Sequence, residues 1–172
     1  MAVRAVEPSD RAAVARLLAE RWGSTTMVSR GACHDASALP GFVAVHAGRI
    51  LGLVTYVVAG AEVELVTLDS LREGSGIGSA LVAAVAEAAA GAGARRMVLV
   101  TTNDNLRALG FYQRRGFRLV HLHAGAVDRA RERKPSIPRT GNDGIPIHDE
   151  LELACDLPAP SRRTRPLRDP VQ

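Results

Sequence analysis

The stretch Arg72–Leu81 reads REGSGIGSAL, with glycine at every second position from Gly74 to Gly78 and an alanine-rich run after it. Glycine lets the backbone approach an anion without a Cβ in the way. A helix that begins here adds free N–H groups and a dipole that favours negative charge. The stretch therefore predicts a phosphate-binding turn that opens a helix ending at Gly91 or Gly93. Taken alone, it fits a plain glycine-rich turn as well.

Two common phosphate motifs do not match this stretch. A P-loop needs Lys and then Ser or Thr after its last glycine, whereas Gly78 is followed by Ser79 and Ala80. The dinucleotide fingerprint belongs after the first strand of a βαβ unit, with a third glycine or alanine at the position that Ser79 or Leu81 occupies here. The stretch instead follows four candidate strands, so a different fold is indicated.

The rest of the chain alternates apolar strand patterns with helical ones. Residues 23–40 are polar and mixed, and we expect a short second helix with loops there. The last strand is expected at an edge or crossover of the sheet. Strands that alternate with helices in this way indicate a mixed sheet covered by helices on both faces. Strands are expected at residues 3–6, 41–58 (a hairpin turning at Ala47-Gly48), 61–68, 96–101, 117–123 and 148–157, and helices at 11–22, 76–91, 105–116 and 126–134.

A second motif follows the apolar strand 96–101. Asn105, Ala108 and Tyr112 are spaced to share one side of a helix, and Gly116-Phe117 ends it. Together the two motifs resemble motifs A and B of the GNAT superfamily of acyl-CoA N-acyltransferases. The resemblance runs from about Val3 to about Leu157. It implies an α+β GNAT fold: a mixed, mostly antiparallel sheet of six to seven strands, flanked by about four helices, in one domain over residues 1–157.

The resemblance also implies acetyl-CoA as co-substrate and no metal. The backbone at Gly74–Gly78 would hold the pyrophosphate, the N–H near Leu68 would polarise the thioester carbonyl, and Asn105 would steady the pantetheine arm or cap its helix. Glu73 departs from the motif, which has Gln or Arg there. The cofactor-binding residues expected on this basis are Leu68, Arg72, Glu73, Gly74, Ser75, Gly76, Ile77, Gly78, Ser79 and Asn105.

The expected catalytic residues are Tyr112, Glu64 and Glu62. By resemblance Tyr112 is the acid that protonates the leaving thiolate, although a helix tyrosine that only packs is the alternative. Glu62 and Glu64 point to one face of their strand, opposite Val63 and Leu65. Glu64 is the first candidate for a base that works through water and Glu62 the second; two solvated carboxylates on an outer face are the alternative.

The function expected from the resemblance is transfer of an acetyl group from acetyl-CoA to a primary amine of a small molecule. Two other functions remain open: a CoA-binding or sensor module without catalysis, and a protein lysine or N-terminal acetyltransferase. The later stretch 134–153 resembles a bacterial GNAT subgroup. Pairing into homodimers, common in the family, is also open to this chain.

Charge and composition limit the kinds of binding partner that we expect. The formal charge is +4, and the segment 158–172 carries four arginines against one aspartate, so the body is close to neutral. This Arg- and Pro-rich tail is expected to be disordered, with no role in binding nucleic acid. Cys33 and Cys155 form no CxxC pair, and no window suits a membrane span or a secretion signal, so a cytoplasmic protein is expected. No histidine has metal-ligand spacing. His148–Glu150 is expected to be a strand end that faces solvent, and a contact with the acetyl acceptor is the alternative.

Overall fold

The computed structural model describes residues 1–72 and 74–158, so the expectations for Glu73 and for the tail from residue 159 lie outside the described residues. The helices are α1 (Arg11–Trp22), α2 (Ile77–Gly91), α3 (Leu106–Gln113) and α4 (Ala126–Arg133). The strands are β1 (Ala2–Ala5), β2 (Thr26–Ser29), β3 (Ala32–Asp35), β4 (Gly41–His46), β5 (Arg49–Ala59), β6 (Glu62–Ser70), β7 (Arg96–Thr102), β8 (Arg118–His123) and β9 (Glu150–Asp156).

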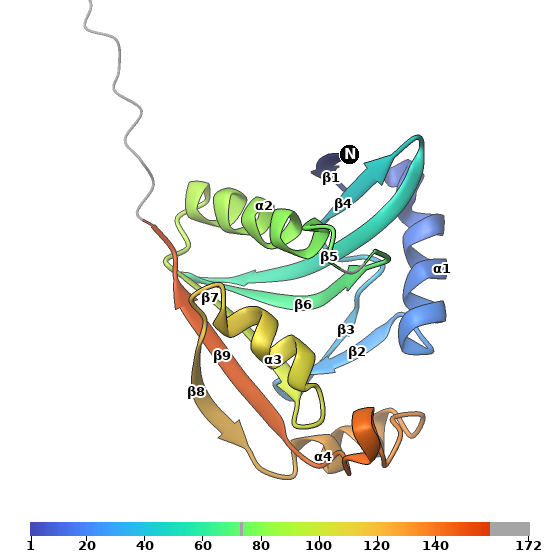
Figure 1. The fold of residues 1–172 in the computed structure, drawn as a ribbon, viewed down its shortest axis with the longest axis vertical. Coiled ribbons are helices and arrows are strands. Elements are labelled where there is room, and N and C mark those ends of the chain that lie inside the picture. The colour runs from blue at the N-terminus through green and yellow to red at the C-terminus, as the bar shows by residue number, and fades with distance from the viewer. Residues whose placement is uncertain (73, 159–172) are drawn as a thin grey trace, which may run out of the picture.

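One seven-stranded sheet, in the order β1-β4-β5-β6-β7-β9-β8, forms the centre of the molecule (Figure 1). Its pairs are antiparallel except β6 with β7. The expected mixed, mostly antiparallel sheet with four α-helices is thus confirmed. Of the two placements expected for the last strand, the edge is wrong, because β9 lies between β7 and β8, and the edge strand on that side is β8; the non-consecutive order fits the expected crossover.

The expectation of a short helix in residues 23–40 was also wrong. β2 and β3 form a separate antiparallel hairpin there. Its turn is Arg30-Gly31, and both residues have left-handed backbone angles, φ 48° and 77°. This is the conformation of the tight turns that match the twist of paired strands. An Arg-Gly turn is a weaker sequence signal than Asn-Gly, because arginine rarely adopts a positive φ.

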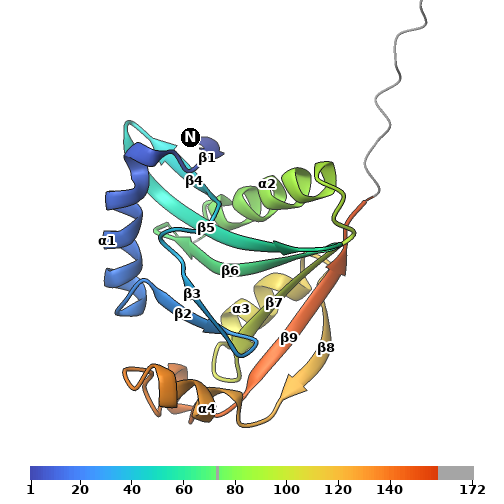
Figure 2. The same cartoon turned by 180° about the vertical axis from the view of Figure 1, so that it is seen from behind.

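The sheet carries helices on both faces. α2 and α3 pack on one face, where Val63, Leu65, Leu81 and Tyr112 belong to one apolar core. α1 packs on the other face over a second, smaller core that includes Leu18 and Leu53 (Figure 2). The β2–β3 hairpin and α4 continue that second face beyond α1. None of the helices in the described part is long and apolar enough to cross a membrane.

The parallel pair β6–β7 is short. It joins Glu62–Leu65 to Arg96–Leu99, and beyond these residues the two strands diverge (Figure 1). A bulge at Val66 interrupts the ladder between β5 and β6 just where the divergence begins. The second half of β6 is therefore not paired with β7, and we call this break in the pairing the opening; α2 and α3 lie on one side of the sheet there and the hairpin on the other.

Candidate active site

A cleft of about 820 Å³ lies where the end of β6 meets the starts of α2 and α3. Leu68, Gly76, Ser79, Asn105 and Tyr112 all line it. The two sequence motifs, which are separated by about thirty residues in the chain, are therefore brought together. Of the expected cofactor-binding residues, Ser75 is absent from the lining and Glu73 lies outside the described residues.

The start of α2 suits an anion. Gly74 and Gly76 have φ of 71° and 79°, which side chains other than glycine rarely adopt. Within residues 1–72 and 74–158 no side chain caps the helix, so its first N–H groups are available to a ligand. Gly78 has a different reason to be glycine, because a Cβ there would come within 3.1 Å of the Phe111 ring. The glycines thus serve two purposes: backbone conformation and close contact between α2 and α3.

Arginine side chains surround the cleft, and sequence reasoning missed most of them. Arg115 donates to the Ser79 hydroxyl, and its guanidinium lies 3.5 Å from the centroid of the Phe111 ring. These contacts fix one cation beside the open end of α2. The signal that could have found it was the pair Arg114-Arg115 inside the second motif. The arginines that line the cleft are Arg21, Arg72, Arg107, Arg114 and Arg115.

Tyr112 reaches the cleft from α3. The residue is 7% exposed, and its ring makes edge contacts with Phe111 and Phe117. Within the described part of the chain, its hydroxyl makes no hydrogen bond to protein. Burial raises the pKa of Tyr112, the negative charge of Asp69 raises it further, and Arg115 opposes them. The phenol is therefore protonated at neutral pH and able to donate a proton.

Asn105 is the N-cap of α3. Its side-chain oxygen accepts a hydrogen bond from the Ala108 N–H at 3.1 Å. This geometry is the capping role that the sequence left open beside a ligand contact. Because Asn105 also lines the cleft, the cap does not exclude a contact with a ligand.

Asp69, one residue after Leu68, is a buried carboxylate that the sequence analysis overlooked. It is 4% exposed and accepts a hydrogen bond from the Trp22 indole at 2.9 Å. The Arg21 guanidinium lies 3.5 Å from its other oxygen. Burial raises the pKa of Asp69, which these two partners partly offset. The last turn of α1 is thereby fastened to β6 at the opening, and Trp22, although 43% exposed, has a defined partner.

Carboxylates gather on the opposite face of the sheet. Glu62 and Glu64 share that face as expected, and both approach Arg30 at the tip of the hairpin. Arg30 lies 2.7 Å from Glu62, 3.8 Å from Glu64 and 3.6 Å from Glu152 of β9. Glu64 also accepts a hydrogen bond from the Ser29 hydroxyl. The alternative of two freely solvated carboxylates is wrong, because the hairpin covers them.

Glu150 corrects a further expectation. We expected this strand end to face solvent, but Glu150 is buried between β7 and β8. The loop before it is held by the turn between β7 and α3. Asp104 accepts hydrogen bonds from the N–H and the side chain of Asn142, and Asn103 accepts them from the N–H groups of His148 and Asp149. β9 is therefore locked beside the opening by residues that follow β7.

Comparison with known proteins identifies this architecture. A family model described as "Acetyltransferase (GNAT) family" matches residues 10–117 of the chain. The chain belongs to the GNAT acetyltransferase family. It is 41% identical over 134 residues to the uncharacterised protein YdhI of Bacillus subtilis, covering 77% of this chain and 84% of that protein. By family this protein is an acyltransferase.

Solved GNAT structures share the fold of this acetyltransferase. A Bacillus subtilis acetyltransferase in complex with CoA superposes with a TM-score of 0.66 at 18% identity, over 91% of this chain and 98% of that one. A GNAT acetyltransferase from Elizabethkingia anophelis with acetyl-CoA bound gives 0.64 at 17% identity, over 91% and 97%. At sequence identities of 17% and 18%, these similarities show a shared fold.

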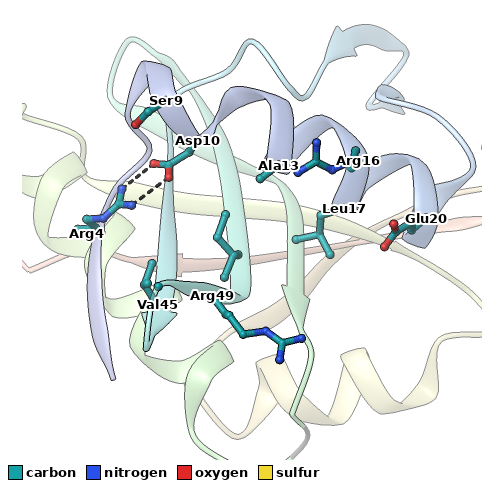
Figure 3. A pocket seen from close by; sticks show the side chains of 11 residues that line it. Arg4, Ser9, Asp10, Ala13, Arg16, Leu17, Glu20, Val45 and Arg49 are labelled. Carbon is teal, nitrogen blue, oxygen red and sulfur yellow. Dashed lines mark hydrogen bonds and ion pairs between the residues drawn. The ribbon is translucent and has the colours of Figure 1, made fainter.

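The acetyltransferase has another pocket, of about 550 Å³, between α1 and the β4–β5 hairpin (Figure 3). In this pocket Arg4 and Asp10 form an ion pair through two hydrogen bonds, at 2.6 and 2.9 Å. Asp10 also accepts the Glu7 N–H, and these bonds lower the pKa of Asp10 to about 2. The pair fastens β1 to the start of α1, which is a structural role. Among the described residues, no group of His, Cys, Asp and Glu is arranged to hold a metal.

Proposed function

We propose that this protein is an N-acetyltransferase that moves the acetyl group of acetyl-CoA to a primary amine of a small molecule. The observation that carries the proposal is one shared cleft. The uncapped, glycine-rich start of α2 and the protonated Tyr112 both line it, beside the opening between β6 and β7. A site that binds a phosphate and presents a proton donor suits transfer from a phosphate-bearing thioester.

The residues present fit coenzyme A. The N–H groups at the start of α2, with Gly74 and Gly76 in left-handed conformations, would hold the pyrophosphate. Arg72, Arg114 and Arg115 would add positive charge around the phosphates. Asn105 would contact the pantetheine arm, and the backbone at Leu68 would face the acetyl group.

Two protons must move during the transfer. Bound acetyl-CoA supplies a thioester, and the C–S bond breaks as the amine nitrogen forms the new C–N bond. We assign to Tyr112 the proton that goes to the departing sulfur. Tyr112 suits this role because it is protonated and its hydroxyl has no protein partner in the described part of the chain. A positioned general acid contributes roughly 10²–10⁴-fold to the rate.

We assign to Glu64 the uptake of the amine proton, through water. An amine with pKa about 10.4 is almost wholly protonated at pH 7, so a base is needed before attack. Glu62 is the weaker candidate because Arg30 binds it at 2.7 Å and Arg96 lies 4.0 Å away. Glu64 is farther from Arg30, at 3.8 Å, and its contact with Ser29 positions one oxygen.

The two assigned groups lie on opposite faces of the sheet. Tyr112 belongs to the core under α2 and α3, while Glu64 lies under the hairpin. Beyond Leu65 and Leu99 the strands β6 and β7 are no longer paired, and we propose that the two substrates meet across this gap. This arrangement supports entry of acetyl-CoA from the α2–α3 side and of the amine from the hairpin side.

The test begins with calorimetric titration of the protein with acetyl-CoA, using ATP and NAD as controls. We expect binding of acetyl-CoA alone, followed by thiol release when a primary amine is added. Tight binding without thiol release across a broad amine panel would favour the sensor module instead. Binding of ATP or NAD in place of acetyl-CoA would refute the proposal.

A further inference from the structure

A separate cavity of about 350 Å³ lies between α4, the β2–β3 hairpin and the adjoining ends of β8 and β9. Val28 and Arg30 border it from the hairpin, and Ala126 and Ala130 from α4. None of the residues assigned above to the coenzyme line this cavity. It lies on the face of the sheet from which the amine is proposed to enter.

Glu150 lines this cavity, yet the residue is only 6% exposed. Burial raises the pKa of this carboxylate, whereas the backbone of Arg30, at the hairpin turn, is close enough to lower it. Within residues 1–72 and 74–158 no side chain forms an ion pair with it. The guanidinium of Arg30 is directed to Glu62, Glu64 and Glu152 instead. His123 and Arg129 lower the pKa of Glu150 as nearby charges, without an ion pair. A buried carboxylate that lacks an ion pair is costly, and a cationic ligand in contact with it would reduce that cost.

Glu150 is also placed beside the opening in the sheet. It is paired with Thr102 on β7, three residues past Leu99, where pairing with β6 has ended. Glu152 alternates with the core residue Leu153, so the side chains of Glu150 and Glu152 share the face of Glu64. Burial raises the pKa of Glu150, and the nearby Glu64 charge raises it further. Glu150 and Glu64 therefore lie on one face of the sheet, near enough for the charge of one to act on the other.

Positive charge lies at the other side of the cavity. Arg129 and Arg133 are one helical turn apart on α4, and both line it. Arg133 donates to the carbonyl of Gly31 and Arg129 to that of Ala124, so neither charge is neutralised by these bonds. In the described part of the chain neither arginine forms an ion pair. The exposed Glu132 and His123, which is paired with Glu152, complete the polar lining.

The charges of Arg129 and Glu150 act on each other, but the two groups form no ion pair within 4 Å. The cavity separates them. A ligand with a cation at one end and an anion at the other would satisfy both sides at once. A simple monoamine would leave the arginines unsatisfied, and a diamine would meet them with like charge.

We propose that this cavity binds the acetyl acceptor as a zwitterion, an amine that also carries a carboxylate. Glu150 binds the ammonium group, and Arg129 with Arg133 binds the carboxylate. This inference rests on the proposed function and adds the substrate class to it. Proton uptake remains with Glu64; Glu150 determines which amines bind.

The test compares β-alanine and glycine with propylamine and 1,3-diaminopropane. Calorimetry in the presence of CoA measures binding without turnover, and thiol release from acetyl-CoA measures transfer. We expect the amino carboxylates to bind at least about 10-fold more tightly than propylamine, as charge-assisted hydrogen bonds predict. We expect 1,3-diaminopropane to bind more weakly than β-alanine.

Variants assign the two ends of the ligand. Glu150→Gln should weaken β-alanine binding about 10-fold or more and leave acetyl-CoA binding unchanged, and Glu150→Asp should restore part of the loss. Arg129→Gln should remove most of the preference for β-alanine over propylamine. The matched controls are Glu87→Gln on α2 and Arg16→Gln on α1. They should change neither the affinity for β-alanine nor the preference for β-alanine over propylamine. Melting curves confirm that each variant is folded.

The outcomes separate the two proposals. Preference for propylamine or 1,3-diaminopropane, or equal effects of Glu150→Gln and Glu87→Gln, overturns the zwitterion proposal while thiol release upholds the transferase. If β-alanine binds through Glu150 but no panel amine yields thiol, the cavity assignment survives and catalysis is refuted. Absence of binding by every amine overturns the cavity assignment.

Discussion

The two faces of the central sheet are built by different means. On the α2–α3 face, the site consists of backbone conformations and a helix start, with arginines and one tyrosine around them. On the hairpin face, the site consists of carboxylate side chains that come from two strands, β6 and β9, and are bridged by Arg30. The first face is suited to one constant phosphate group, and the second to an adjustable partner.

This difference shows which half of a two-substrate site can change. A turn of glycines with fixed φ tolerates few substitutions, because side chains other than glycine strain it. A cluster of side chains on a hairpin and a short helix can be altered one residue at a time. We expect variation in the amine to be accommodated by β2, β3 and α4, with the α2 start held constant.

The largest expected effect tests the α2–α3 face. Tyr112→Phe should lower kcat by roughly 10²–10⁴ and leave acetyl-CoA binding unchanged, because Phe keeps the ring contacts with Phe111 and Phe117. Burial raises the pKa of Tyr112, so its proton is lost only at higher pH, and the wild-type rate should not fall through this group below pH about 10.

Steady-state thiol release with a pH series measures both values. Tyr56→Phe, which alters a tyrosine stacked on Phe42 elsewhere in the sheet, is the matched control and should be nearly silent. If the kcat of Tyr112→Phe is within about threefold of wild type, Tyr112 is not the proton donor and only packs in the core.

The second prediction contrasts two carboxylates on the hairpin face. Glu64→Gln should lower kcat by about 10²-fold at neutral pH, since an amide takes up no proton. Glu62→Gln should cost only a few-fold, because Glu62 serves mainly to bind Arg30 and Arg96. A larger loss of kcat in Glu62→Gln than in Glu64→Gln would identify Glu62 as the base.

The third prediction tests backbone conformation. Gly76→Ala should weaken acetyl-CoA binding about 5- to 30-fold, because alanine at φ 79° costs roughly 1–2 kcal/mol. Its Cβ would meet no atom within 4 Å, so the cost is conformational and not steric. Gly48→Ala, at φ 74° in the β4–β5 turn, should lose similar stability but no affinity. Equal losses of acetyl-CoA affinity in Gly76→Ala and Gly48→Ala would show that the start of α2 does not bind acetyl-CoA.

The smallest effect lies away from both sites. Asp10→Asn should lower the free energy of unfolding by about 1 kcal/mol at pH 7 without changing turnover. The folded-state pKa of Asp10 is lowered to about 2, below its unfolded value near 4. Its contribution is therefore complete above pH about 4 and lost as pH falls toward 2. Urea unfolding at pH 7 and pH 2.5 measures this; an equal deficit at both would exclude ionisation as the cause.

The sequence predicted the α2–α3 face well because its signals are local. Glycine spacing and the Asn105–Tyr112 period each lie within one element, and the structure joins them in one cleft. Helix α1 was predicted with the residues it has, Arg11–Trp22. The alternating pattern around Glu62 and Glu64 likewise fixed which side chains share a face.

The hairpin face could not be predicted because its contacts are long-range. Arg30 meets Glu62 and Glu152 only after β2–β3 folds across the sheet. Asp69 is buried by the Trp22 indole, 47 residues earlier, and no spacing rule joins them. Glu150 follows a polar run that is typical of a surface, and only the placement of β9 between two strands buries it.

That placement bears on how the protein is made. β9, the last strand of the described residues, lies between β7 and β8, so during synthesis both neighbouring strands lack a partner until β9 has been made. A nascent or prematurely terminated chain that stops before Glu150 exposes an apolar edge on β7 and leaves β8, with Leu119 and Leu122 at its surface, without its partner. Such open edges pair readily with other chains. Small C-terminal truncations into β9 should therefore yield aggregates and not a weakened enzyme.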